Sequence, residues 1–173
     1  MDNLLENDIS FLQETDLFKN FSAAQTAQVL KICRKVHCSE NDVIMREGEE
    51  GDRMYIIMAG SVEVIRRLTL DCVDDESAEK SKVFTRLDAD RHPVFGEIAL
   101  LAEFKRTATV RALTDCTLYE INRKDFLSLA EADYEFGYRI LLNLAGILSA
   151  RLKKADEETI KLTTVLSMIL KET

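Results

Sequence analysis

Residues 95–112 hold, within a short segment, side chains that could bind an anionic phosphate ester with a free hydroxyl group. The charge, the free oxygens and the hydroxyl of such a ligand must each find a partner when water is removed. Gly96 permits a close approach of the backbone, and Glu97 is a hydrogen-bond acceptor. Arg106 offers a guanidinium fork for phosphate oxygens, and Thr107 adds a hydroxyl beside it. The spacing predicts a site for an anionic small molecule.

The residues between the glutamate and the arginine can supply further donors. Residues 98–101 can form one helical turn whose first amides have no partner in the helix. The structural alternative is that Arg106 only pairs with Glu103 at a surface turn, which would contribute less than about 1 kcal/mol. We prefer ligand binding, because one segment supplies all the groups that the ligand needs.

Other kinds of site find little support. Two histidines and the lack of a Gly-x-Ser-x-Gly or triphosphate-binding loop argue against catalysis, so we expect a binding protein and not an enzyme. Cys33, His37 and Cys38 lie close together, but their spacing is not that of a zinc site and no second pair of ligands follows. We expect no metal.

The composition limits the partners. The 173 residues are 46% hydrophobic and carry a net charge of −8, so the field of the whole protein opposes nucleic acid and anionic membranes. An anionic ligand therefore needs a local cationic site. No apolar run reaches 18 residues, the N-terminus is acidic, and four scattered cysteines suit free thiols. We expect a cytoplasmic protein.

Helical patterns enclose a region of strands. Residues 1–34 read as helical, with a capping box at Ser22 and Gln25. Hydrophobic runs predict strands at 43–45, 54–58, 62–65, 83–87, 107–113 and 117–121. Gly60 marks the best hairpin turn, residues 69–81 read as a mobile solvated loop, and Asn122 can cap a helical region that continues to the end. The pattern predicts an α+β fold.

A heptad pattern runs along the C-terminal helical region. Ten residues, here called the seam, alternate by three and four: Tyr138, Leu141, Ala145, Leu148, Leu152, Ala155, Thr159, Leu162, Leu166 and Ile169. A second stripe of Ile140, Leu144 and Ile147 could pack on the chain's own β core. Because the seam continues past any such contact, we expect a homodimer through a coiled coil.

Two segments resemble the phosphate-binding cassette of the cyclic-nucleotide-binding domain family. They are Phe95-Gly96-Glu97-Ile98-Ala99-Leu100 and Arg106-Thr107-Ala108-Thr109-Val110-Arg111-Ala112. The resemblance extends over about residues 10–155. It implies an antiparallel β-roll, or jelly roll, of about eight strands, with N-terminal helices, a short cassette helix and a long C-terminal helix.

The resemblance also implies roles for single residues. Arg106 would pair with the cyclic phosphate, Glu97 would accept from the ribose 2′-hydroxyl, and Thr107 would reach the phosphate or a guanine edge. The amides near Ile98 and Ala99 would complete the phosphate site, which also includes Phe95, Gly96 and Ala108. Arg151 or a neighbour would cover the base. Cyclic AMP is slightly favoured over cyclic GMP.

Two regions depart from the family pattern. The connection over residues 87–94 is longer than usual and contains His92 and Pro93, and the base-facing end has no motif that aligns. We expect a binding domain over residues 1–133 and a helix for dimerisation and closure over 134–173. A DNA-binding unit would need about sixty further residues, so we expect none here.

These observations predict that the protein senses a cyclic nucleotide. Movement of the C-terminal helix would signal to an effector protein, which is not identified, that the nucleotide is bound. The alternative is a ligand-free dimeric scaffold that keeps the fold. The chain could also be a fragment of a larger regulator.

Overall fold

The computed structural model describes residues 2–68, 80–91, 93–101 and 105–171, so most of the loop expected over residues 69–81 lies outside the described residues. The helices are α1 (Asp2–Glu14), α2 (Ala23–Ile32), α3 (Ile98–Leu101), α4 (Arg123–Ala132) and α5 (Tyr134–Lys171). Two short 3₁₀ turns accompany them, η1 (Asp16–Phe18) and η2 (Ala89–Arg91).

Eight strands form two four-stranded sheets. They are β1 (Cys33–Cys38), β2 (Val43–Met45), β3 (Arg53–Ala59), β4 (Ser61–Leu68), β5 (Lys80–Asp88), β6 (Val94–Phe95), β7 (Thr109–Ala112) and β8 (Cys116–Asn122). One sheet has the order β1-β8-β3-β6 and the other β2-β7-β4-β5, and every pairing is antiparallel. The predicted α+β fold with an antiparallel β-roll is confirmed.

Local signals in the sequence set several boundaries. Gly60 joins β3 to β4 at a φ of +87°, which glycine adopts without strain. A Cβ there would lie 2.4 Å from the Asp115 carbonyl oxygen, so the predicted turn also needs glycine for space. The Ser22 capping box is present, and Asn122 caps α4 by accepting from the Lys124 amide. These predictions are confirmed.

The N-terminal region differs from the sequence-based expectation at two places. The residues between Glu14 and Ala23 interrupt the helix predicted over 1–34, and the chain becomes a strand at Cys33. This strand, β1, was not predicted, because Arg34, Lys35 and His37 obscure its alternation. It is identified only by its partner, since all six of its residues pair in register with β8. Tertiary pairing decides this element.

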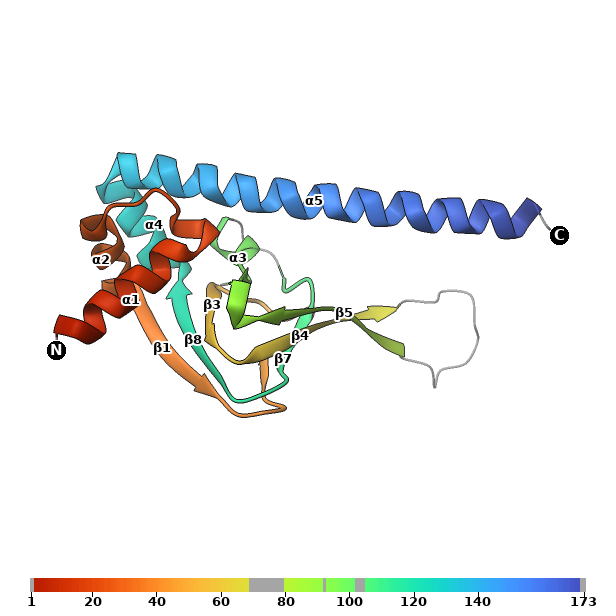
Figure 1. Ribbon diagram of the computed structural model, residues 1–173, viewed down its shortest axis with the longest axis horizontal. Coiled ribbons are helices and arrows are strands. Elements are labelled where there is room, and N and C mark those ends of the chain that lie inside the picture. Colours follow the sequence, from red (N-terminus) through yellow and green to blue (C-terminus); the bar gives the residue numbers. More distant parts are fainter. Residues whose placement is uncertain (1, 69–79, 92, 102–104, 172–173) are drawn as a thin grey trace.

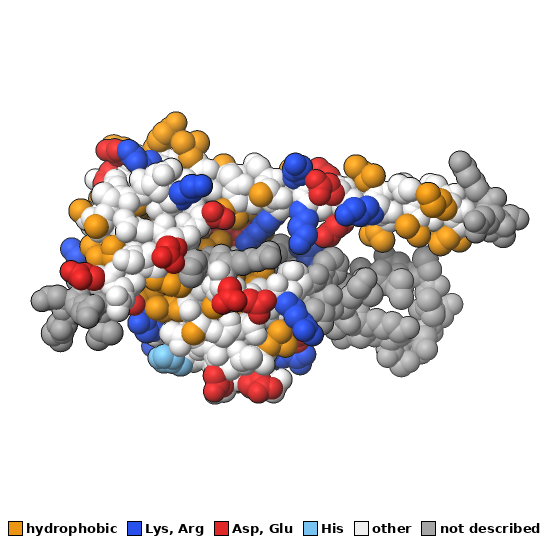
Figure 2. All heavy atoms as spheres, viewed as in Figure 1, with side chains coloured by type: hydrophobic (Ala, Val, Ile, Leu, Met, Phe, Trp, Pro, Cys, Tyr) orange, Lys and Arg blue, Asp and Glu red, His pale blue; other side chains and the backbone are white. Residues whose placement is uncertain are grey.

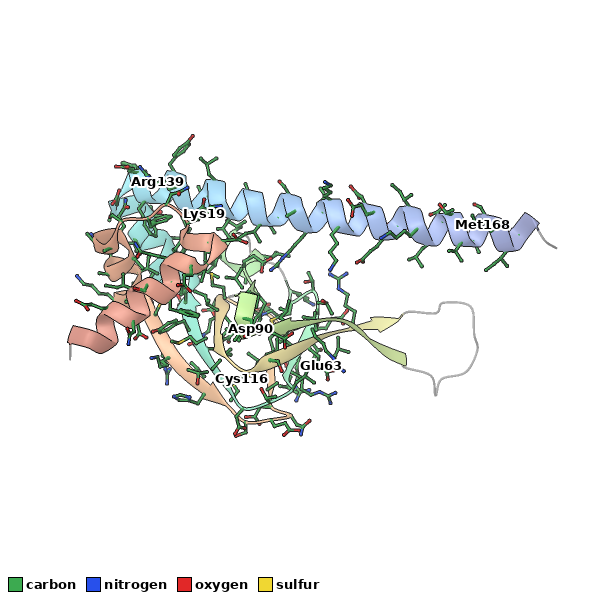
Figure 3. All side chains as sticks on the ribbon, in the orientation of Figure 1. Lys19, Glu63, Asp90, Cys116, Arg139 and Met168 are labelled. Atoms are coloured by element: carbon green, nitrogen blue, oxygen red, sulfur yellow. The ribbon has the colours of Figure 1, made fainter. Side chains whose placement is uncertain are left out.

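The first turns of α5 anchor it to the body. Phe136, Ile140 and Leu144 are fully buried in a core shared with the N-terminal helices and with β3 and β8. Ile147, the third residue of the second stripe, packs partly buried against the same core. Asn143 Nδ2 donates to the carbonyls of Leu17 and Lys19, at 2.9 and 3.0 Å. Arg139 lies close to Lys19 in Figure 3, and its Nη1 donates to the carbonyl of Asn20.

The rest of α5 runs past the two sheets in the direction of the β4–β5 hairpin (Figure 1). Residues 149–170 are all exposed, and Figure 2 shows apolar side chains along this distal part of the helix. Among the helices of the described ranges, none has the length and apolarity needed to cross a membrane. One helix therefore has an anchored start and an uncovered end.

Candidate ligand-binding site

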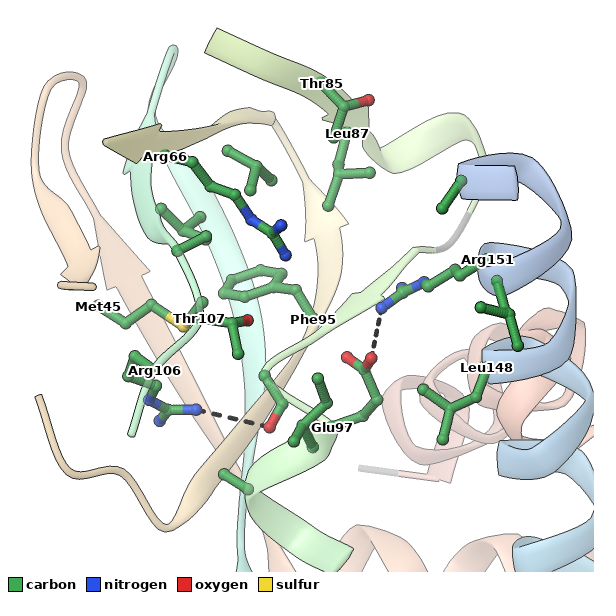
Figure 4. Close-up of a pocket in the computed structure, with 18 of the residues that line it drawn as sticks. Met45, Arg66, Thr85, Leu87, Phe95, Glu97, Arg106, Thr107, Leu148 and Arg151 are labelled. Carbon is green, nitrogen blue, oxygen red and sulfur yellow. Dashed lines mark hydrogen bonds and ion pairs between the residues drawn. The ribbon is translucent and has the colours of Figure 1, made fainter. Parts of the chain in front are cut away.

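Arg106, just before β7, is held inside the molecule by its backbone and its side chain. Its amide donates to the Glu49 carbonyl at 2.8 Å, and its carbonyl accepts from the Gly48 amide at 2.9 Å. Only 9% of the residue is exposed. Its Nη1 donates to the Arg53 carbonyl at 2.8 Å and to the Gly96 carbonyl at 3.5 Å, and Figure 4 draws the second of these bonds. Glu103, the surface partner considered above, lies outside the described residues.

Two glycines make room for this guanidinium. A Cβ on Gly51 would lie 2.0 Å from Arg106 Nε, and one on Gly96 would lie 2.8 Å from Nη1. Gly96 also has a φ of +73°, which strains any residue with a side chain. The backbone is therefore shaped around the guanidinium of Arg106.

Glu97 is the second buried charge of the site, and only 2% of it is exposed. Its Oε1 accepts from Arg151 Nη1 at 2.5 Å, and Arg151 Nη2 donates to the Val94 carbonyl at 2.6 Å. Arg151 reaches down from α5, so this pair ties the helix to the cassette (Figure 4). Our expectation placed Arg151 over the base of a ligand, which stays a prediction, and the structure places its guanidinium on Glu97.

The helical turn α3 lies between Glu97 and Arg106 in the sequence. β6 leads into Gly96, and the amides of Ala99 and Leu100 donate to the carbonyls of Gly96 and Glu97. The predicted helical turn is therefore present, although the Ala99 amide already has a partner at 3.1 Å. Phe95 stacks on Tyr55 with ring centroids 5.1 Å apart. Burial, with the nearby Glu120 carboxylate, raises the pKa of Tyr55, so its hydroxyl stays neutral.

A cavity of about 640 Å³ lies between the β-roll and α5, within the range for small-molecule pockets. Among its lining residues five are basic and two are acidic, in a chain whose net charge is −8. The chain therefore has the local cationic site that an anionic ligand needs. α5 contributes six lining residues, namely Leu148, Arg151, Leu152, Lys154, Ala155 and Glu158.

The cavity brings together all nine residues that the sequence analysis proposed. They are Phe95, Gly96, Glu97, Ile98, Ala99, Arg106, Thr107, Ala108 and Arg151. Sequence reasoning missed Lys105 and the strand residues of the lining, which are Met45, Val64, Arg66, Thr85, Leu87 and Val110. Arg66 and Thr85 come from β4 and β5, on the side of the cavity away from Arg106 (Figure 4). Only strand alternation could have indicated them.

The cysteines lie outside this cavity. Cys33, Cys38 and Cys116 are free thiols, as predicted, while Cys72 lies outside the described residues. Burial, followed by the charge of Asp8, raises the pKa of Cys33 to about 12. Over the described ranges, no group of three His, Cys, Asp or Glu side chains could hold a metal ion.

Comparison with known proteins agrees with this geometry. Residues 35–133 match the family model described as "Cyclic nucleotide-binding domain". The chain is 31% identical over 120 residues to a cAMP-dependent protein kinase regulatory subunit of Blastocladiella emersonii, covering 69% of this chain and 27% of that protein. It is 32% identical over 138 residues to cGMP-dependent protein kinase isozyme 1 of Drosophila melanogaster, covering 75% of this chain and 17% of that protein.

The fold has solved counterparts. The catabolite activator protein of Thermus thermophilus superposes with a TM-score of 0.72 at 24% identity, covering 86% of this chain and 63% of that chain. At this identity the likeness concerns the fold. The chain spans less than a third of the two curated relatives named above, so their whole activities cannot be transferred to it.

Proposed function

This chain belongs to the cyclic nucleotide-binding domain family, and we propose that it is a sensor in which the ligand changes the position of α5. The observation that carries the proposal is the pair of buried charges in one cavity, Arg106 held between two glycines and Glu97 beside it. A buried guanidinium and a buried carboxylate suit a ligand with both an anionic group and a hydroxyl donor.

The proposed contacts follow from this pair. Arg106 donates to the oxygens of the cyclic phosphate in exchange for its bonds to the backbone carbonyls. Glu97 accepts from the ribose 2′-hydroxyl, and Thr107 reaches the phosphate or the base from the same cavity. Cyclic AMP is the ligand we favour, from the resemblance described above, although the relatives compared include proteins named for cAMP and for cGMP.

The proposed signal passes through Arg151. A ribose hydroxyl and the Arg151 guanidinium would approach the same carboxylate, so the ligand weakens the bond that ties α5 to the cassette. Leu148, Leu152 and Ala155 line the cavity and also belong to the seam. Ligand contact with these residues would therefore affect the surface through which we propose that two copies associate.

The exposure of the seam supports the homodimer. Tyr138, Leu141, Leu152, Leu162, Leu166 and Ile169 each have more than half of their surface exposed. The body-facing stripe of α5 is buried separately, so the seam is not needed to attach the helix to its own chain. Burying the seam against a second α5 would remove this apolar surface from water. An effector protein that reads the dimer remains part of the proposal.

Isothermal titration calorimetry of the purified chain with cAMP and with cGMP tests the function. We expect saturable heat with one or both ligands and a thermal shift that increases with ligand concentration. If neither nucleotide produces heat or a thermal shift, the sensor proposal is rejected. That result would favour the ligand-free dimeric scaffold, for which the exposed seam is the supporting observation.

A further inference from the structure

The last three turns of α5, residues 159–170 and here called the tip, are apolar over more of their circumference than a two-stranded coiled coil would cover. Their exposed large apolar side chains are Ile160, Leu162, Val165, Leu166, Met168, Ile169 and Leu170, each at least 54% exposed. At 100° per residue, Val165 and Leu170 flank the seam on opposite sides. Lys161 is the only charged residue among these twelve.

The positions that flank the seam change character at the start of the tip. When Tyr138 and Leu141 are assigned to heptad positions a and d, the flanking e and g positions before the tip include Arg151, Asp156 and Glu158. Charged residues are usual there in two-stranded coiled coils. Within the tip the same positions are Thr163, Val165 and Leu170. Uncharged flanks widen the surface that association can bury.

The residues of the seam change in the same place. Position a is Leu166 and position d is Ile169 in the last heptad. Leucine at a with isoleucine at d shifts parallel coiled coils from two strands toward three or four. The two observations are independent, because one concerns the seam and the other concerns its flanks.

The polar side chains of the tip already have hydrogen-bond partners within the helix. The hydroxyls of Thr159, Thr163, Thr164 and Ser167 each donate to the carbonyl four residues earlier, at 2.8 to 2.9 Å. A hydroxyl bonded within its own helix can be buried at a helix interface without losing its partner. The tip can therefore contact several helices at once.

From these observations we infer that the tips of four copies of this chain form a parallel four-helix bundle, in which two seam dimers meet. The inference rests on the proposed dimer and goes beyond it. Nearer the body only two helices can associate, because the g positions Leu144 and Arg151 are occupied by the chain's own core and by Glu97. An uncharged apolar surface needs a partner of the same kind, and a second copy of the tip supplies one.

Sedimentation velocity of the full chain over a range of concentrations tests the inference. The wild-type protein should approach four times the 19.7 kDa of one chain. The informative variant is Val165→Glu with Leu170→Lys, because opposite charges at g and e can pair across a parallel dimer but oppose burial in a bundle. We expect this variant to sediment as a dimer, with half the mass of the wild-type tetramer.

Matched controls and the other outcomes separate the two proposals. Ile160→Glu with Met168→Lys alters side chains of similar exposure at positions away from the bundle interior, and it should keep the tetramer. A wild-type protein that stays dimeric at all concentrations would overturn the bundle and leave the dimer standing. A monomeric wild-type protein would overturn both. A flank variant that stays tetrameric would show that the four copies meet elsewhere and would also overturn the bundle.

Discussion

At the scale of single residues, the site depends on two charges that are buried before any ligand arrives. Arg106 satisfies its guanidinium with backbone carbonyls, and Glu97 satisfies its carboxylate with Arg151. Burying a charge without a partner is costly, and these bonds offset that cost. They are also bonds that a ligand with matching groups can replace.

Replacing Arg106 by alanine should weaken binding of the preferred cyclic nucleotide by about 30-fold to several thousand-fold, equivalent to about 2 to 5 kcal/mol. The reason is that a buried phosphate would lose its cationic partner. Calorimetric titration measures the effect. Arg34→Ala, which changes an exposed arginine of β1, is the control and should bind normally. Unchanged affinity in Arg106→Ala would remove this residue from the site.

The glycine beside the guanidinium allows a second test. Gly51→Ala would place a Cβ 2.0 Å from Arg106 Nε, so the flexible arginine side chain must move while the fold can remain. We expect at least about tenfold weaker nucleotide binding, or about 1.4 kcal/mol, with little change in melting temperature. Gly146→Ala in α5 meets no atom within 4 Å and should bind normally. If Gly51→Ala binds like the wild type, the position of the guanidinium does not matter.

At the scale of elements, α5 contributes to three surfaces along its length. Its first turns are buried in the core, its middle turns line the cavity, and its last turns are exposed. A helix transmits a displacement along its axis because its backbone hydrogen bonds are continuous. The pair between Arg151 and Glu97 lies where the anchored part ends, so it can control the part that follows.

Breaking that pair should loosen the helix in the absence of ligand. In Arg151→Ala, we expect the amides of residues 148–158 to exchange with deuterium at least about threefold faster than in the wild type. Adding nucleotide to the wild type should change exchange in the same segment, and this response should shrink in the variant. Lys161→Ala removes an exposed basic residue of the same helix outside that segment and should leave the exchange of residues 148–158 unchanged. Identical exchange in all three proteins would contradict the proposed coupling.

At the scale of the whole molecule, the surfaces along α5 connect the state of the cavity to assembly. The two sheets hold the cassette and Arg106, while the helix lies over the cavity and continues away from it (Figure 1). Leu148, Leu152 and Ala155 contribute to both surfaces, because they line the cavity and belong to the seam. Nucleotide binding and association are therefore expected to be thermodynamically linked.

The assembly can be tested with charges in the seam. Leu141→Glu together with Leu162→Glu places like charges against each other in any seam-mediated dimer, so we expect a monomer by sedimentation velocity. Circular dichroism should show an intact fold, because both residues are exposed in the single chain. Ile160→Glu, at a similarly exposed position outside the seam, is the control. A double variant that sediments like the wild type would exclude the seam as the interface.

Much of the candidate site could be predicted because its key residues lie within one segment. Gly96, Glu97 and Arg106 are separated by only ten positions, so their joint chemistry is visible before any folding is considered. The heptad spacing of α5 and the turn at Gly60 are likewise local patterns. Local patterns can be read from the sequence because they depend on neighbouring residues alone.

What the sequence by itself determined was therefore the segment that we propose binds phosphate, most of the strands and the apolar seam. Only the tertiary structure decided that β1 is a strand, because this polar segment becomes extended by pairing with β8. Only the tertiary structure placed Arg66 and Thr85 around the cavity and Arg151 on Glu97. Arg66 lies 40 positions before Arg106, and Arg151 lies 54 positions after Glu97, and no periodicity along the chain encodes such a distance.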